Sequence, residues 1–260
     1  MARSPTRVRR EGRSRHRGTI GPCAGSLIGV EDLDRRLLAF LGAHPFVLAS
    51  QIERFLGIDH ATVDRRLVAM EARRLARSER LQMSGVAFVR VTGAGLRAIG
   101  SRLPAPGFDL AGYRHDVGIV WLWVAAWEGV FGEPERVLSR REMQALDRAA
   151  GQAGDPDGRF SVPLVGPTTA GPLYPDVMMV FSSARVAVHL VAWPQRRLDL
   201  DGLFAGHHKR PEVADVVLCF VDDDAVGRKL RTAAEREGVA EKVRVQRVVG
   251  EGTALPRAGS

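Results

Sequence analysis

The stretch that decides the fold is Asp59-His60-Ala61-Thr62-Val63-Asp64-Arg65-Arg66-Leu67-Val68-Ala69-Met70-Glu71. Its apolar residues Val63, Leu67 and Met70 recur at helical spacing, so they share one face of a helix. Asp59 stands before that helix, where its carboxylate is placed to accept hydrogen bonds from the first exposed N–H groups. The stretch is therefore predicted to be a helix with one buried face and one exposed face.

Two further helices are predicted before this stretch. The first covers residues 31–42 and the second covers residues 49–56, with Pro45 between them and Gly57 after the second. Their inward-facing apolar residues are Leu33, Leu37, Leu38, Phe40, Leu41, Ile52, Phe55 and Leu56. Three helices with a turn between the second and the third are typical of a helix-turn-helix.

A β-hairpin is predicted directly after the third helix. Its strands cover residues 80–83 and 87–91, and they meet at the turn dipeptide Ser84-Gly85. A further helix is expected to begin after Thr92, which is placed to cap it. This order of three helices, hairpin and helix resembles the winged-helix transcription regulators.

The exposed face of the third helix is predicted to contact DNA. That face carries small residues beside arginine, and arginine binds a guanine edge or a phosphate. The DNA-contacting residues predicted in this domain are His60, Thr62, Arg65, Arg66, Arg80 and Arg90. The alternative is a solvated face on a domain that binds proteins, because Asp64 beside these residues would repel phosphate.

The positive charge of the chain is concentrated at its start. The formal net charge is +8, and residues 1–18 hold seven arginines against one glutamate. Residues 1–28 are expected to form a disordered arm that follows phosphates or enters a minor groove. Its predicted DNA contacts include Arg7, Arg9, Arg10 and Arg13. The alternatives for this arm are a solubilising tail or a wrongly assigned start codon.

Several classes of protein are excluded by composition. The two cysteines, Cys23 and Cys219, lie far apart and predict neither a disulfide framework nor a zinc cluster. The longest apolar run, residues 117–127, is shorter than the roughly 20 residues that span a bilayer. The first residues lack the apolar core of a secretory signal. A cytoplasmic, nucleoid-associated protein without a metal or cofactor is expected.

The second half of the chain is predicted to form an α/β domain with a mixed sheet. Residues 101–112 read as a linker, and an aromatic helix begins at Tyr113. This helix either packs within the chain, which we favour, or forms a dimer seam. The other predicted elements are a helix at 133–149, a loop at 151–158, a strand hairpin at 173–181 and 184–192, a helix from 199, a strand at 214–221, a helix at 225–237 and a strand at 243–248.

This order of parts resembles the replication-relaxation family of actinobacterial and plasmid-borne proteins. The residues that carry the likeness are Asp59 to Met70, Leu81 to Leu96, His115-Asp116, Pro175-Asp176 and Val186 to Ala192. The resemblance implies a winged helix joined to a domain similar to the PD-(D/E)xK nuclease fold. The expected fold class is thus α+β, with an N-terminal winged helix-turn-helix domain and a degenerate nuclease-like domain.

A nuclease of this type needs two acids for Mg²⁺ and a lysine for the attacking water. Asp176 matches the first acid, but His189-Leu190-Val191 stands where the second acid and the lysine are required. We therefore expect a domain without catalytic activity. The alternative is a metal-dependent endonuclease that recruits Asp199 or Asp201 with Lys209. The neighbouring His207 and His208 are expected to be solvated loop residues rather than ligands.

The predicted organisation has five segments. They are an arm at 1–28, a winged helix at 29–100, a linker at 101–112, an α/β domain at 113–250 and a flexible tail at 251–260. The predicted function is sequence-specific binding of double-stranded DNA, in regulation of transcription or in plasmid or phage maintenance. A homodimer is left open, no membrane or small-molecule cofactor is expected, and a protein-interaction adaptor is a third alternative.

Overall fold

A computed structural model describes residues 31–80, 85–107, 109–153, 159–163, 172–191 and 199–248. The predicted arm, with Arg7, Arg9, Arg10 and Arg13, lies outside the described residues, as does the predicted tail. In the part of the chain that is described, no helix is long and apolar enough to cross a membrane.

The first unit holds the three predicted helices. They are α1 (Asp32–Ala43), α2 (Ala49–Leu56) and α3 (His60–Ala72). Asp59 caps α3 as predicted, because its Oδ1 accepts a hydrogen bond from the Thr62 N–H at 2.9 Å. Val63, Leu67 and Met70 are buried as predicted. The helical spacing of the central stretch therefore identified both the start of the helix and its core face.

The hairpin that follows is a wing, but it begins earlier than predicted. Strand β1 (Ala76–Arg80) pairs with β2 (Ala87–Val91) in antiparallel register. The predicted start of the first strand at residue 80 is wrong, because Arg74 adopts a φ of 58° and turns the chain immediately after α3. Residues 81–84, which hold the rest of the predicted first strand and the first predicted turn residue, Ser84, lie outside the described residues.

A single-residue bridge completes the winged-helix arrangement. Val47, between α1 and α2, pairs antiparallel with Val89 of β2. Val47 therefore serves as a single-residue third strand beside the hairpin, just before α2 begins. The helix α4 (Gly93–Ala98) follows, and Thr92 caps it by accepting a hydrogen bond from the Gly95 N–H at 3.0 Å. The element order and the bridge together define a winged-helix unit.

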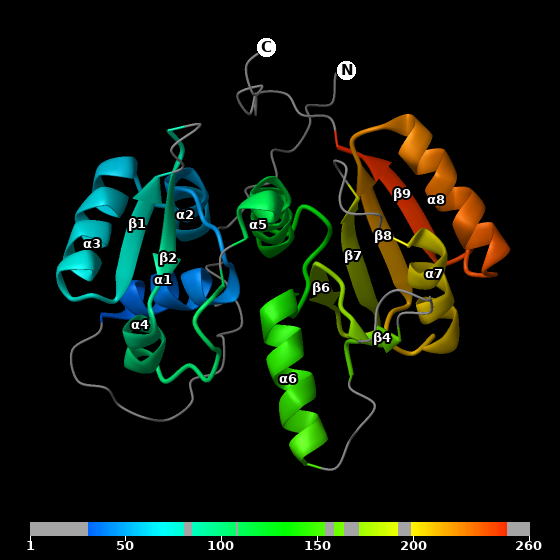
Figure 1. Cartoon of the computed structure of the whole chain (residues 1–260), viewed down its shortest axis with the longest axis horizontal. Coiled ribbons are helices and arrows are strands. Elements are labelled where there is room, and N and C mark those ends of the chain that lie inside the picture. Colours follow the sequence, from blue (N-terminus) through cyan, green and yellow to red (C-terminus); the bar gives the residue numbers. More distant parts are fainter. Residues whose placement is uncertain are drawn as a thin grey trace, which may run out of the picture.

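The second unit is built on the predicted mixed sheet. Its strands are β3 (Arg136–Ser139), β6 (Val177–Val180), β7 (Arg185–Val191), β8 (Val216–Val221) and β9 (Val243–Arg247), in that spatial order. The first three are antiparallel, and β7, β8 and β9 are parallel. Helices α7 (Leu200–Lys209) and α8 (Asp224–Arg236) connect the parallel strands and cover the sheet face that lies away from the winged helix (Figure 1).

Two sequence predictions in this unit are wrong. The predicted helix at 133–149 begins with β3, and only then continues as α6 (Arg140–Gln152). Ser139 ends the strand and starts the helix, because its side chain and that of Glu142 form a reciprocal capping box. The predicted strand at 173–181 is divided into β5 (Pro172–Leu173), which pairs with β4 (Val162–Pro163), and β6. Pro175 lies in the break and has no N–H to donate to a ladder.

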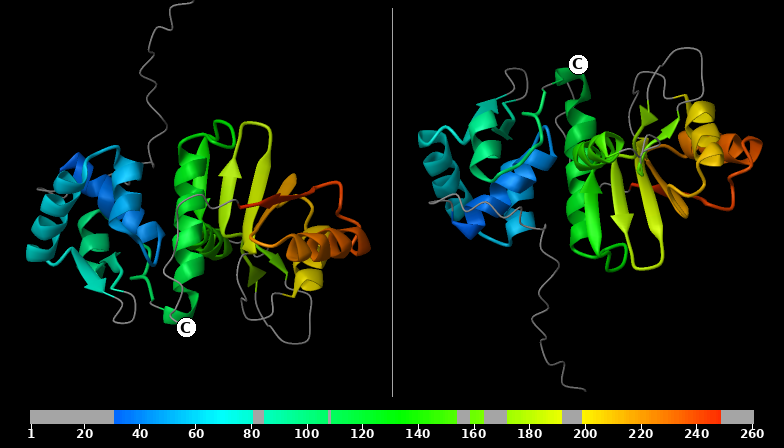
Figure 2. Two further views of the ribbon diagram at one scale, coloured as in Figure 1. Left: turned by 90° about the horizontal axis from the view of Figure 1, so that it is seen from above. Right: turned by 90° about the horizontal axis from the view of Figure 1, so that it is seen from below.

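The aromatic helix α5 (Tyr113–Trp127), which follows the short turn η1 (Leu110–Gly112), lies between the winged helix and the sheet. Both views in Figure 2 place it there. On one side, Phe55 of α2 contacts Trp123 with ring centroids 5.5 Å apart. On the other side, Gly118 faces Leu190 of β7 so closely that a Cβ would lie 2.6 Å from its Cδ2. The helix packs within the chain, and one hydrophobic cluster runs through it from α1 to the sheet.

Candidate nucleic-acid interface

The outer face of α3 combines Arg65 with small and apolar side chains, and the exposed Asp64, which pairs with His60 at 3.3 Å, borders it. Ala61, Arg65, Val68 and Ala69 are exposed, and Val68 is 66% exposed, which makes it the most exposed large hydrophobic residue in the described part of the chain. The sequence interpretation did not assign Val68. Its position five residues after the buried Val63 already turned it away from the core face.

Arg65 lies on this outer face as predicted. Its Nη2 donates to the Thr62 hydroxyl at 3.0 Å, and its Nε donates to the Ala61 carbonyl at 3.4 Å. The Thr62 hydroxyl donates in turn to Asp59 at 2.8 Å. Thr62 is therefore half-buried in the helix cap. Among the described residues, no carboxylate lies within ion-pair distance of Arg65, so its charge is available to a partner.

Arg66, predicted on the outer face, lies at its edge with 33% of its side chain exposed and is paired with acids. Its guanidinium forms ion pairs with Glu31 and, at 3.4 Å, with the buried Asp34 of α1. Arg73 approaches the same Asp34 at 3.6 Å. The prediction is wrong because Arg66 follows Val63 by three positions, which turns its side chain toward α1. Arg66 therefore ties α1 to α3.

His60 stands at the start of α3, where the sequence placed it, but it is flanked by acids. Its Nδ1 lies 2.6 Å from a Glu53 oxygen, and its Nε2 lies 3.3 Å from an Asp64 oxygen. The hydrogen bond to Glu53, and then the charges of Asp64 and Glu53, raise the pKa of this exposed histidine. A phosphate at this helix end would therefore meet a histidine that already has two anionic partners.

The two arginines predicted on the wing have different environments. Arg80 is exposed at the end of β1. Arg90 is only 8% exposed, and its Nη2 donates to the Pro106 carbonyl at 2.6 Å. The prediction that Arg90 reaches a phosphate is wrong, because the segment after α4 covers this side of β2. Arg74, just before the wing, and Arg77, on β1, are exposed and were missed by the sequence interpretation, and Arg77 forms an ion pair with Glu79 at 2.7 Å.

A second polar site surrounds Asp176, just before β6. Asp176 is 3% exposed and accepts a hydrogen bond from the Leu190 N–H at 2.8 Å. Arg140 forms an ion pair with its Oδ1, and the His115 Nε2 lies 3.4 Å from the same oxygen. Burial alone would raise the pKa of Asp176, but Arg140 and His115 outweigh it and hold this pKa well below its usual range. The carboxylate is therefore charged and fully engaged within the chain.

A pair of buried histidines lies next to Asp176, with His189 beside the carboxylate and His207 beside His189. His189 of β7 and His207 of α7 are 5% and 3% exposed, and their Nε2 atoms lie 3.3 Å apart. Burial lowers the pKa of His189 to about 4 and that of His207 to about 3. The expectation that His207 is a solvated loop residue is wrong, because α7 turns it toward the sheet. These lowered pKa values favour the neutral form of both rings near pH 7, and the two Nε2 atoms lie within hydrogen-bond distance of each other.

The residues named for a nuclease do not gather at Asp176. Asp199 caps α7 by accepting from the Gly202 N–H at 3.0 Å, and Asp201 forms an ion pair with Arg236 of α8. Lys209 is exposed at the end of α7. Within the described ranges, no group of three or more His, Cys, Asp or Glu side chains is arranged to hold a metal ion. The neighbours that the structure gives Asp176 are the Arg140 guanidinium, the imidazoles of His115 and His189, and the half-buried carboxyl of Asp116, whose pKa is raised to about 6 by burial and, to a smaller extent, by Asp176.

No protein-family model and no curated protein matches the chain. Among solved structures, ZitR from Lactococcus lactis in complex with DNA is 16% identical, with a TM-score of 0.28, over 44% of this chain and 72% of its own. The PcaV transcriptional regulator from Streptomyces coelicolor is 16% identical, with a TM-score of 0.25, over 48% and 74%. PigF with SAH is 14% identical, with a TM-score of 0.19, over 84% and 57%. Because these TM-scores are low, the winged helix is identified from the order of its own helices and strands and not from these structures.

Proposed function

We propose that the chain is a sequence-specific double-stranded DNA-binding protein that regulates transcription. The observation that carries this proposal is the outer face of α3, where Arg65 stands among exposed small and apolar side chains. An α-helix fits the major groove of B-DNA, and the small residues Ala61 and Ala69 allow close approach to the base edges. The third helix would therefore read the major groove with the wing beside it.

Arg65 and Val68 supply complementary chemistry for this reading. Arginine donates two hydrogen bonds to the O6 and N7 of guanine, and an apolar side chain contacts the methyl group of thymine. Arg65 gives up two exposed hydrogen bonds, to the Thr62 hydroxyl and to the Ala61 carbonyl, when it turns to a base. Arg74, Arg77 and Arg80 would contact phosphates and so fix the register of the helix. Base reading is thus assigned to Arg65 and Val68, and not to Arg66.

Replacing Arg65 with Ala should weaken binding to a selected cognate duplex by about 1 to 3 kcal/mol, or roughly 5- to 150-fold, and weaken random duplex less. Fluorescence anisotropy on both duplexes measures the difference. Arg97→Ala, which removes an exposed arginine from α4, is the matched control for loss of charge. Equal losses on both duplexes would make Arg65 a phosphate contact. Absence of binding to any duplex at low salt would leave the protein-interaction adaptor.

Val68 is tested by the chemistry of the base itself. Replacing the thymines of the cognate site with uracil removes only the methyl groups, and we expect a loss of about 1 kcal/mol per contacted methyl. Val68→Ala should be nearly insensitive to this replacement. Equal sensitivity in the variant and in the unaltered protein would assign the methyl contact to another residue.

The arginine arm should control the salt dependence of binding. Deleting residues 1–18 removes seven arginines and should flatten the plot of log K against log salt by about 0.9 for each phosphate that they neutralise. A variant with these arginines replaced by glutamine separates charge from chain length. An unchanged slope in both variants would remove the arm from the DNA interface.

The biological setting follows from the resemblance to replication-relaxation proteins. This resemblance suggests that the protein acts in plasmid or phage maintenance as well as in transcription, and that it acts at the nucleoid. A homodimer would present two α3 helices to half-sites one helical turn apart, about 34 Å. A palindromic selected site supports this arrangement, and a single half-site supports a monomer.

A further inference from the structure

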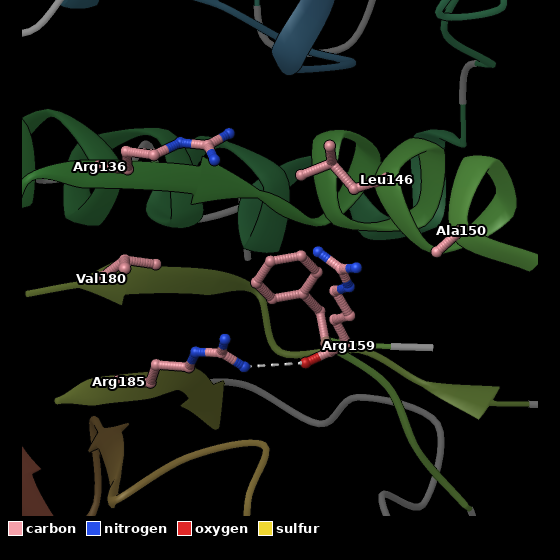
Figure 3. A pocket seen from close by; sticks show the side chains of 7 residues that line it. Arg136, Leu146, Ala150, Arg159, Val180 and Arg185 are labelled. Atoms are coloured by element: carbon pink, nitrogen blue, oxygen red, sulfur yellow. Dashed lines mark hydrogen bonds between the residues drawn. The ribbon is translucent and has the colours of Figure 1, made fainter. Parts of the chain in front are cut away.

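A hollow lies on the sheet at the end opposite to Asp176. It measures about 310 Å³ and is open between α6 and the ends of three strands (Figure 3). Arg136 begins β3, Val180 ends β6 and Arg185 begins β7, and these three residues are neighbours in the strand register. The lining residues are Arg136, Leu146, Ala150, Arg159, Phe160, Val180 and Arg185. None of them belongs to the DNA-reading face or to the Asp176 site.

The hollow brings together three guanidinium groups from three separate elements. Figure 3 shows Arg136, Arg159 and Arg185 around the same opening. The Nη1 of Arg185 donates to the Arg159 carbonyl at 3.4 Å, and its guanidinium carbon lies 5.6 Å from the Phe160 ring centre. In the described part of the chain, the guanidinium groups of Arg136 and Arg185 form no ion pair, although the Asp215 carboxylate accepts a hydrogen bond from the backbone N–H of Arg185 at 2.8 Å. Like charges repel, so this arrangement favours an anion among them.

The segment that carries Arg159 is held firmly. The buried carboxylate of Asp147 on α6 accepts hydrogen bonds from the N–H groups of Arg159, Phe160 and Ser161, at 2.7, 3.2 and 3.2 Å. Because these bonds fix the backbone, Phe160 keeps its place in the wall of the hollow. The site is therefore built in advance of any ligand, which lowers the entropy cost of binding.

The rest of the lining is apolar. Leu146 of α6 is 37% exposed, although it sits on a helix whose other large apolar side chain, Met143, is buried. Leu146, Phe160 and Val180 together give an apolar wall beside the cations. Ligand sites of this kind pair an apolar lining with a few polar groups that orient the ligand. An inorganic ion would use only the cations and would leave this wall in water.

We propose that this hollow binds a small organic phosphate with an aromatic or other apolar body. The phosphate lies between Arg136 and Arg185, since guanidinium groups bind phosphate oxygens in pairs. The apolar body lies against Leu146 and Val180. Phosphate is favoured over carboxylate because two cations, Arg136 and Arg185, face the opening and a phosphate monoester carries close to two negative charges at neutral pH.

The test is calorimetric titration of the full chain with phenyl phosphate, compared with inorganic phosphate and with phenol. We expect phenyl phosphate to bind saturably, with an affinity at least about tenfold higher than that of inorganic phosphate or of phenol. Arg136→Gln and Arg185→Gln should each weaken it about tenfold or more. Arg148→Gln removes an exposed arginine of α6 that does not line the hollow, and should leave the affinity unchanged. Leu146→Ala, which removes apolar contact area without adding charge, should weaken the binding of phenyl phosphate and leave that of inorganic phosphate unaffected.

Thermal melting of each variant shows that it is folded, and Arg185→Lys retains the charge while it loses the paired hydrogen bonds. Equal affinity for phenyl phosphate and inorganic phosphate, or equal losses in Arg136→Gln and Arg148→Gln, would overturn the proposal. So would a loss of DNA affinity in Arg136→Gln without any binding of phenyl phosphate, which would make these arginines contacts to the DNA backbone.

Discussion

Asp176→Ala is expected to lower the free energy of unfolding by about 3 kcal/mol or more, because it leaves a cation and an N–H group without their buried acceptor. Asp176 is the point where Arg140, His115 and the Leu190 N–H meet. Arg140 is itself 45% exposed, so water recovers part of its charge stabilisation and the loss stays at the lower end of the range for buried pairs. Urea denaturation measures the change.

Asp176→Asn is the matched control for this prediction. The amide keeps the shape and an acceptor for the Leu190 N–H but loses the charge, so its loss should be smaller than that of the alanine variant. A loss below about 1 kcal/mol in Asp176→Ala would contradict a structural role for the carboxylate. Plasmid cleavage with Mg²⁺ that disappears in a fully stable Asp176→Ala variant would instead assign the carboxylate to a metal.

Acid should destabilise the protein steeply between about pH 6 and pH 4, because three histidines are neutral when folded but take up protons when unfolded. Burial lowers the pKa of His44 to about 3, that of His189 to about 4 and that of His207 to about 3, from an ordinary value of 6.5. Their full stabilisation is present above pH 6.5 and is lost as the pH falls toward the folded values. Burial raises the pKa of Asp116 to about 6, which binds one extra proton in the folded state and offsets one histidine.

The net result is an uptake of up to about two protons on unfolding, or at most about 2.7 kcal/mol for each pH unit. Urea denaturation at a series of pH values measures this slope. His44→Phe should reduce the uptake by one proton, because phenylalanine does not titrate. The substitution should be tolerated, because His44 packs edge-on against Phe40 and Trp123 and its Nε2 has no hydrogen-bond partner among the described residues. A stability that stays flat over this pH range would show that the buried histidines titrate normally.

The sequence was most informative where periodicity and caps agree. The helical spacing of Val63, Leu67 and Met70 and the cap at Asp59 placed α3 correctly. Helix geometry alone, at about 100° per residue, also separates Arg66 from Arg65, because it places Arg66 about 60° from Val63 and Arg65 about 160° from it. The identity of the acids that hold Arg66 depends on how α1 packs, which no local pattern contains.

Strand and site residues were harder to predict. Arg90 was predicted to reach a phosphate because it lies on the wing, but four consecutive residues of β2, Phe88 to Val91, are buried. Strand β3 was missed because only Val137 and Leu138 are apolar within it, and their partners on β6 lie some 40 residues further along the chain. The Asp176 site draws on four helices and strands between His115 and His207, so only the folded chain brings it together.

The hydrophobic core around α5, which the winged helix and the sheet share, limits which part of this protein can be separated from the rest. Phe55 lies 5.5 Å from Trp123 and 5.7 Å from Trp127, and Gln51 donates to the Val117 carbonyl at 2.9 Å. A fragment that ends at the predicted boundary near residue 100 would leave α2 without this cover. A transplant of the winged helix onto another protein therefore has to carry the chain through Trp127, together with a substitute for the sheet that α5 packs against.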